Sequence, residues 1–263
     1  MDNGAHEHAS LTYASYLALD EVLSAQRPRS DEHDEMLFIV IHQVYELWFK
    51  QMLHELAHVQ RRLEQGDTAH ALRGLDRVLK VLKVVVAQID VLETMMPAQF
   101  SGFRARLDAA SGFQSHQFRE LEAVLGRRDQ RVARHYPEGG RARARVAAAM
   151  SRPSLYDSFL AYLRVHGYPA PERPDVRRPP EPSPEAQEVL LAVYRDDGAP
   201  ASVCERLVDL DEGLQEWRYR HVKMVERTIG DKAGTGGSPG AGYLRTTLFT
   251  PMFPDLWAVR ARL

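Results

Sequence analysis

Two histidines lie within long apolar and aromatic stretches, where an imidazole needs an explanation. His42 falls inside HDEMLFIVIHQVYELWFKQMLHEL, with Phe38 one helical turn before it and Tyr45 about one turn after it. His221 follows Trp217 by one turn in a second such stretch. A lone histidine on an apolar face usually bonds a carbonyl or a water. An imidazole that faces an aromatic pocket instead suits a flat ligand or cofactor, and the helices alone leave both interpretations open.

A guanidinium and a glycine-rich stretch could complete such a pocket. Arg104 follows two phenylalanines and precedes a Ser-Gly turn, a position typical either of a surface side chain or of a two-point carboxylate ligand. The stretch AGTGGSPGAGYL, residues 233–244, can close over a ligand with its backbone amides exposed. It lacks the spacing of a dinucleotide-binding fingerprint and the Lys-Ser/Thr ending of a phosphate-binding loop.

Residues 54–58 match HExxH, the pattern in which two histidines one turn apart bind zinc and the glutamate activates water. No HxxGxxH continuation follows. At about 100° per residue, His54 and His58 lie roughly 120–160° around the helix from His42, on a side that they share with Lys50. That side is typical of a solvated face, so we do not expect a zinc protease.

The elements that must position these groups are helices. Helical spacing predicts helices over residues 11–25, 33–56, 68–96, 114–125, 141–148, 154–165, 185–196, 200–229 and 252–262. We expect the helix over 33–56 to be buried over most of its circumference and to be capped by Asp34 or the residue before it. Pro97 is expected to end the next long helix.

The linking segments give no sign of a second domain. Residues 97–106 are expected to lead into a loop, and the proline-rich residues 169–184 to form a surface loop. No strand pattern of any length is present. We therefore expect an all-α, helical bundle-like single domain over residues 1–263, with long central helices.

The composition excludes several classes of protein. Of 263 residues, 44% are apolar and 27% are charged, and the net charge is −2. The basic residues are scattered, so no nucleic-acid partner is expected, and no apolar run is long enough to span a membrane. Cys204 is the single cysteine, which rules out an internal disulfide, a four-cysteine zinc site and covalent attachment of a c-type haem. We expect a cytoplasmic protein.

Two imidazoles on buried helical faces, an aromatic pocket, a candidate carboxylate ligand and no thiolate pair suit a haem held by one histidine. The sequence resembles the tryptophan 2,3-dioxygenase family. The resemblance lies in LTYASYLALDEVLSAQ, HDEMLFIVIHQVYELWFKQMLHEL, LETMMPAQFSGFR, SGFQSHQFRELE and WRYRHVKMVERTIGDKAGTGGSPGAGYLR, in the family's order. These blocks cover most of the chain outside roughly residues 127–200, a region that is weakly similar and shortened.

The resemblance implies an all-helical homotetramer, a dimer of dimers, with one b-type haem per subunit that is active in its ferrous (Fe²⁺) form. It implies insertion of both atoms of O₂ across the indole C2–C3 bond of L-tryptophan to give N-formyl-L-kynurenine. That reaction would be the first step of tryptophan degradation by the kynurenine route.

The resemblance also implies the residues on the haem side. His221, in WRYRH, matches the proximal ligand of the haem iron. Ser111, Gly112 and Phe100 match positions of the haem pocket, although Phe100 stands where some bacterial members have tyrosine. Pro239 replaces the more usual serine after GTGGS, which is expected to stiffen the loop.

On the substrate side, His42 matches a distal histidine near the indole N–H, and Phe38 an aromatic residue packed against the indole. Arg104 matches the partner of the substrate carboxylate. Thr235, with Gly234 beside it, matches the contact to the amino acid end. Because addition at an indole does not need removal of the N–H proton, we interpret His42 as an orienting hydrogen-bond partner.

The N-terminal arm, residues 1–30, carries Tyr13 and Tyr16 three residues apart, so that they share a face of the expected helix. These tyrosines can simply pack against the body of the protein. The resemblance implies that the arm is exchanged between subunits and brings both tyrosines to the partner's pocket.

Three alternatives stay open. A related haem monooxygenase or dioxygenase acting on a substituted tryptophan in secondary metabolism would use the same residues. Product mass distinguishes one inserted oxygen atom from two. A haem-binding sensor without turnover would not need Arg104 and Thr235, and metal analysis would test the zinc protease.

Overall fold

The computed structural model describes residues 10–108, 110–235 and 240–263, and these form helices joined by turns and loops, without a strand. The α-helices are α1 (Tyr13–Leu17), α2 (Leu19–Leu23), α3 (His33–Glu64), α4 (Thr68–Leu92), α5 (Pro97–Arg104), α6 (His116–Val124), α7 (Arg141–Met150), α8 (Leu155–Val165), α9 (Pro184–Asp196), α10 (Ala199–Ile229), α11 (Ala241–Arg245) and α12 (Pro254–Ala258). Short 3₁₀ helices are η1 (Gly112–Gln114), η2 (Gln130–His135) and η3 (Val259–Arg262). The predicted all-α fold is confirmed. None of the described helices is long and apolar enough to cross a bilayer.

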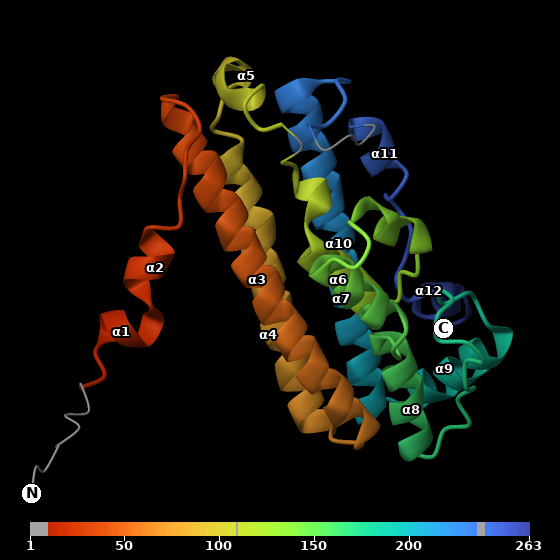
Figure 1. Ribbon diagram of the computed structural model, residues 1–263. Helices are drawn as coiled ribbons and strands as arrows, with labels where there is room; N and C mark the ends of the chain where they lie inside the picture. The colour runs from red at the N-terminus through yellow and green to blue at the C-terminus, as the bar shows by residue number, and fades with distance from the viewer. Residues whose placement is uncertain (1–9, 109, 236–239) are drawn as a thin grey trace, which may run out of the picture.

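Three long helices form the frame of the molecule. α3 and α10 each pack along α4, and α6 and α8 also pack against α3 (Figure 1). An α-helix advances 5.4 Å per turn with a fixed geometry, so the position of a residue along a long helix determines where its side chain emerges. Functional groups on α3 and α10 are therefore held by one continuous support.

The central helix differs in three respects from the expectation. It begins at His33 after Glu32, whose side chain makes no capping hydrogen bond, so the expected cap at Asp34 or His33 is wrong. It continues to Glu64 because no proline or glycine interrupts residues 57–64. It also exposes Met36, Val40 and Leu47, so it is less buried than its sequence suggests.

Several boundaries were also predicted wrongly. α4 already ends at Leu92, and Pro97 does not terminate it but begins α5, where the missing N–H of proline costs nothing. The predicted helix over 11–25 is broken at Ala18, whose positive φ of 50° separates α1 from α2. η2 and α11 were not predicted. The helices over 154–165, 185–196 and 200–229 and the loop over 169–184 agree with the structure within a residue or two.

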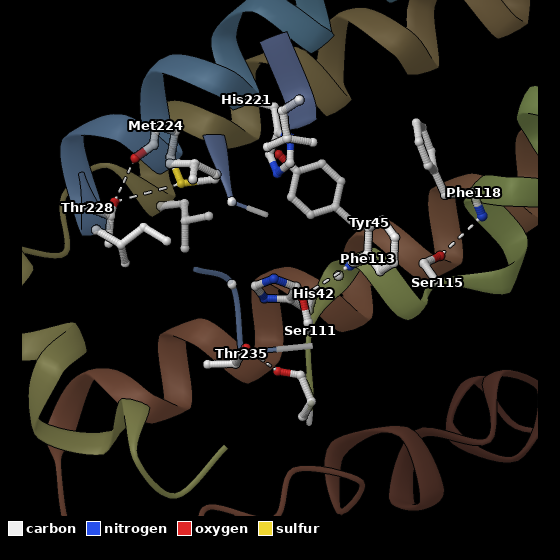
Figure 2. A pocket seen from close by; sticks show the side chains of 18 of the residues that line it. His42, Tyr45, Ser111, Phe113, Ser115, Phe118, His221, Met224, Thr228 and Thr235 are labelled. Atoms are coloured by element: carbon white, nitrogen blue, oxygen red, sulfur yellow. Dashed lines mark hydrogen bonds between the residues drawn. The ribbon is translucent and has the colours of Figure 1, made fainter. Parts of the chain in front are cut away.

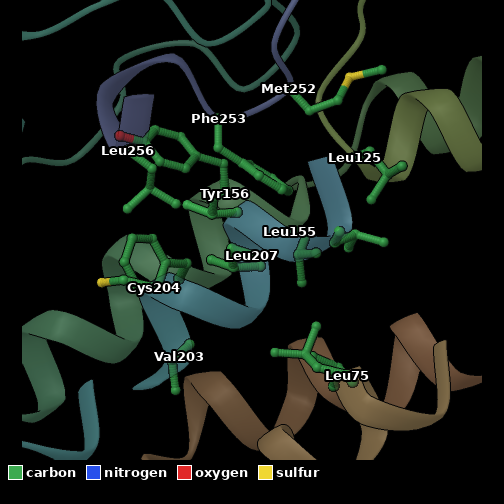
Figure 3. Close-up of a cluster of buried hydrophobic side chains, with 14 of the residues drawn as sticks. Leu75, Leu125, Leu155, Tyr156, Val203, Cys204, Leu207, Met252, Phe253 and Leu256 are labelled. Carbon is green, nitrogen blue, oxygen red and sulfur yellow. The ribbon is translucent and has the colours of Figure 1, made fainter. Parts of the chain in front are cut away.

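The main apolar core lies between α4, α8, α9, α10 and the C-terminal segment (Figure 3). Leu75, Tyr156, Leu207 and Phe253 are among its fully buried members, and Cys204 lies in the same cluster, away from any candidate site. The carboxylate of Asp211 accepts hydrogen bonds from the backbone N–H groups of residues 252 and 253 and thereby fixes the C-terminal segment on α10. This core leaves the other ends of α3 and α10 free to line a pocket.

Candidate active site

A large pocket lies between α3 and α10, and about 1550 Å³ of empty space belongs to it when its open mouth is included. Figure 2 shows His42 and His221 on opposite sides of this space. The sequence-predicted residues that line it are Phe38, His42, Phe100, Arg104, Ser111, Gly112, His221, Gly234 and Thr235.

His42 enters the pocket from α3 with a defined tautomer. Its Nδ1 lies 2.7 Å from the carbonyl oxygen of Phe38, one turn earlier. A carbonyl only accepts, so Nδ1 carries the proton and Nε2 presents a lone pair. Burial lowers the pKa of His42, and this effect outweighs the opposing influence of the Phe38 carbonyl. The side chain is therefore a neutral imidazole whose Nε2 can accept one hydrogen bond.

His221 enters from α10 and is also neutral. Burial, together with the nearby His42 and Arg119, lowers its pKa to about 4. Its ring stacks on Trp217, with the two centroids 5.1 Å apart and the planes 7° from parallel. This stacking fixes the plane of the imidazole, and no described residue hydrogen-bonds to either ring nitrogen. A neutral, oriented imidazole with a free lone pair has the properties of a metal ligand.

An aromatic wall stands beside His42. The ring centroid of Phe38 lies 4.1 Å from that of His42, 5.8 Å from that of Phe100 and 5.6 Å from that of Phe103. Phe100 and Phe103 meet edge to face at 5.4 Å. α5 supplies both of these rings, and α3 supplies Phe38. Such a wall suits a flat aromatic group placed next to the imidazole.

Two hydrogen bonds tie the loops at one side of the pocket together. A guanidinium nitrogen of Arg104, Nη2, donates to the carbonyl of Ala233 at 2.5 Å. The hydroxyl of Thr235 donates to the carbonyl of Ala110 at 2.8 Å. The Thr235 hydroxyl donates its proton to the Ala110 carbonyl, so toward a ligand its oxygen can act only as an acceptor, for example of a hydrogen bond from a cation. Arg104, the last residue of α5, keeps other N–H groups that could donate to an anion.

Glycines shape the same region. Gly240 has φ of +67°, and a Cβ there would lie 2.5 Å from the carbonyl oxygen of Lys232, so only glycine closes the base of the loop. Gly112 differs, because its φ is ordinary and a Cβ would meet nothing within 4 Å. The space beside Gly112 therefore belongs to the pocket. Pro239, which we expected to stiffen this loop, lies outside the described residues.

A buried charge cluster also lines the pocket, and we did not single it out from the sequence. Glu122 accepts hydrogen bonds from Arg119 at 2.7 Å and from Arg218 at 3.0 Å, and from Arg127 at 3.1 Å. Burial disfavours the ionised carboxyl, but the three arginines outweigh it and hold the pKa of Glu122 below its usual value. Within this cluster three guanidinium groups share one carboxylate. The sequence did hold a signal for this cluster. Arg119 and Glu122 are three residues apart, as are Arg218 and His221, which places each pair on one face of a helix.

Two predicted features do not join the pocket. Tyr13 and Tyr16 are 77% and 72% exposed on α1, and no described residue before Phe38 lines the pocket. In the HExxH stretch, Glu55 is buried and pairs with Arg77 at 3.0 Å. Among the described residues no group of three or more His, Cys, Asp or Glu side chains could hold a metal ion. Glu55 is thus engaged in an ion pair between α3 and α4.

Comparison with known proteins gives a consistent result. The family model described as tryptophan 2,3-dioxygenase matches residues 2–152 and 185–263. The tryptophan 2,3-dioxygenase of Anaeromyxobacter sp. (strain K) is 68% identical over all of this chain and 99% of its own length. The enzymes of that name from Herpetosiphon aurantiacus and Caulobacter vibrioides are 55% and 47% identical, over 97% and 96% of this chain and 99% and 98% of their own lengths. The family model leaves residues 153–184 unmatched, a shorter region than the 127–200 expected.

Proposed function

Because the chain belongs to the tryptophan 2,3-dioxygenase family, we propose that the pocket between α3 and α10 is its active site. The activity is the insertion of both atoms of O₂ across the indole C2–C3 bond of L-tryptophan, which gives N-formyl-L-kynurenine. None of the relatives described above is named for the one-oxygen reaction. The observation that carries the assignment of the site is that two neutral imidazoles, on α3 and α10, face one large aromatic pocket.

The family is haem-dependent, and the residues of this pocket fit a haem. His221 is a neutral imidazole whose plane is held by Trp217, and no described residue hydrogen-bonds to its ring nitrogens, so one of them is free to bind iron. Gly112 leaves open space that a side chain would fill. We propose that His221 is the proximal ligand of a haem b and that Ser111, Gly112 and Phe100 line its pocket. The haem, when bound in its ferrous form, supplies the activation of O₂, which side chains cannot provide.

The buried charge cluster suits the two carboxylates of a b-type haem. Arg119 and Arg218 line the pocket, and their shared partner Glu122 cannot neutralise both of them and Arg127 as well. Burying a guanidinium group that has no carboxylate of its own costs free energy, and a carboxylate supplied by a ligand lowers that cost. We propose that Arg119 and Arg218 would hold the two propionate groups of the haem. The opposite end of the pocket, at Arg104, then remains for the substrate.

The substrate end holds one amino acid in one direction. Arg104 pairs with the carboxylate of L-tryptophan, because its remaining N–H groups can make a charge-assisted fork. Thr235 accepts a hydrogen bond from the ammonium group, because its own proton is engaged by Ala110. With both charged groups fixed, the indole must pack against the ring of Phe38, beside His42. Gly234 allows the backbone to come close to the ligand.

His42 orients the indole and needs no proton change. Its Nε2 lone pair accepts the indole N–H, since Nδ1–H is fixed on the carbonyl of Phe38. The product contains every atom of L-tryptophan and of O₂, so the reaction requires no net loss of a proton. Neutral His42 therefore acts as a hydrogen-bond acceptor that selects one rotation of the indole ring, and the aromatic wall excludes water from it.

The exposed arm suits an exchange between subunits. α1 and α2 are helices of five residues each without a buried residue, and short isolated helices are marginal in water. Their exposed side chains include Tyr13 and Tyr16, which do not reach the pocket of their own chain. We propose a homotetramer, a dimer of dimers, in which each arm brings both tyrosines to the partner's pocket. Light scattering would measure the mass of this assembly.

Haem titration of two matched variants tests the assignment. His221→Ala and His42→Ala each remove one pocket imidazole of lowered pKa. We expect the His221 variant to lose the Soret spectrum of a histidine-bound haem, and the His42 variant to keep it but to turn over L-tryptophan more slowly. Anaerobic reduction followed by L-tryptophan and O₂ should give a product heavier by two oxygen atoms. A gain of one oxygen atom, or haem binding unaffected by His221→Ala, would contradict the proposal.

A further inference from the structure

The base of the arm is held far more firmly than the arm itself. Glu35, in the first turn of α3, is 1% exposed. Its carboxylate accepts hydrogen bonds at 2.8 Å from the backbone N–H groups of Arg29 and Ser30, and a third from the Ser30 hydroxyl. Burial disfavours its ionised form, but these hydrogen bonds outweigh burial and hold the pKa of Glu35 below its usual value. Burying a carboxylate costs free energy unless donors surround it, and here three donors from Arg29 and Ser30 compensate. The arrangement therefore favours one backbone path for these two residues.

Further contacts fix the same segment from two other directions. From the end of α5, Arg106 donates to the carbonyl of Arg29 at 3.1 Å. From α3, Gln43 donates to the carbonyl of Ala25 at 3.2 Å and accepts from the side chain of Gln26 at 2.6 Å. Residues 25–30 therefore follow α3 along a defined line. We call these contacts, centred on Glu35, the arm clasp.

Beyond the clasp the chain projects from the body (Figure 1). Leu11, Tyr13, Tyr16 and Leu23 are each more than 70% exposed. The two short helices nevertheless have local order: Thr12 and Ser15 form a capping box at the start of α1. Exposed apolar side chains on short helices that bury no residue of their own suit docking on an external surface.

We propose that Glu35 is a positioning residue that fixes the direction of the arm and so delivers Tyr13 and Tyr16 to the pocket of a second copy of this chain. The inference rests on the arm exchange proposed above and adds to it the device that makes the exchange efficient. A fixed base reduces the number of directions that the arm can take, so less conformational entropy is lost when it docks. Glu35 itself touches no substrate.

The variant Glu35→Gln keeps the volume of the side chain but turns an amide N–H₂ toward backbone donors. Asp34→Asn is the matched control, because it removes one charge from the same turn and no hydrogen bond joins the Asp34 side chain to residues 25–30. In Glu35→Gln we expect amide hydrogen exchange of residues 29 and 30 to be at least about 10-fold faster, and KM for L-tryptophan to rise while kcat stays within about 2-fold. The control should behave as the wild type. An unchanged exchange rate or an unchanged KM would overturn the proposal.

A mixed assembly separates delivery of the arm from damage to the variant's own pocket. Chains with Glu35→Gln are co-expressed, under a second tag, with chains that carry His221→Ala and an intact clasp. Only the first chain can hold haem, so the measured turnover comes from its pocket alone. Where the two chains exchange arms, that pocket receives the intact arm of the partner. We expect KM in the purified mixed assembly to return toward the wild-type value. If KM stays raised, Glu35 acts within its own subunit and the proposal is wrong.

Failure of the proposed function would look different. A wild-type protein that binds no haem, or forms no two-oxygen product, would refute the active-site assignment whatever Glu35 does. A wild-type protein that is active as a monomer would refute the arm exchange, and the clasp with it, but not the active site. Far-UV circular dichroism and the Soret absorbance per chain verify that each variant is folded.

Discussion

Removal of the Arg104 guanidinium should weaken recognition of the substrate carboxylate and little else. Arg104 lines the pocket, and one of its nitrogens already donates to the carbonyl of Ala233. Arg104→Gln loses a charge-assisted hydrogen bond to the substrate, worth about 1.5–3 kcal/mol, and the solvent-exposed hydrogen bond to Ala233, worth about 1 kcal/mol. Only the first loss depends on the substrate. At about 1.4 kcal/mol per factor of ten, it predicts a substrate-dependent decrease of roughly 10- to 150-fold in kcat/KM.

The assay compares two substrates that differ by one group. L-Tryptophan carries the carboxylate, and tryptamine lacks it but keeps the indole and the ammonium group. In the wild type and in Arg104→Gln, kcat/KM is measured for each, or Kd from the Soret shift where turnover is too slow. For tryptamine we expect a loss of about 5-fold, from the broken tie to Ala233 alone. Equal losses for both substrates would refute the reasoning, because Arg104 would then only support the loop.

Two further predictions concern the haem side of the pocket. Glu122→Gln leaves Arg119 and Arg218 buried without their carboxylate and should lower the free energy of unfolding at pH 7 by about 3–5 kcal/mol, as measured by urea denaturation. Because the folded-state pKa of Glu122 lies below the ordinary 4.5, its stabilisation is present above pH 4.5 and is lost as pH falls through the folded pKa; a difference from wild type that does not shrink in acid would contradict this. Gly112→Val should fold with a Tm within about 2 °C of wild type, since its Cβ meets no atom within 4 Å, but should bind haem at least about 10-fold more weakly. Haem affinity equal to wild type would show that the space beside Gly112 is not part of the ligand site.

Helical periodicity carried most of the fold prediction. The long helices around His42 and His221 were predicted because their apolar residues recur every three or four positions, a property of the local chain. Their ends were predicted less well. α3 has no capping side chain at its start, and Pro97 begins a helix where we expected it to end one. Local signals such as proline are compatible with either end of an element, and tertiary packing selects one.

The candidate site was predicted in its residues more than in its interactions. The resemblance to the family identified His42, Arg104, His221 and Thr235, and the structure brings all four to one pocket. It did not reveal that Arg104 and Thr235 are already engaged by backbone carbonyls of the opposite loop. Those hydrogen bonds join residues 129 and 125 positions apart, and no pattern within a single segment indicates them.

The sequence by itself determined the all-α class, the faces of α3 and α10 that carry the imidazoles, and the family. Only the tertiary structure decided that Glu122 binds arginines from α6, from α10 and from the segment directly after α6, and that Glu35 accepts hydrogen bonds from the base of the arm. The physical reason is the range of the forces involved. Helix formation depends on neighbours within about four residues. The pairing of buried charges depends instead on which helices pack together and exclude water from the charged groups.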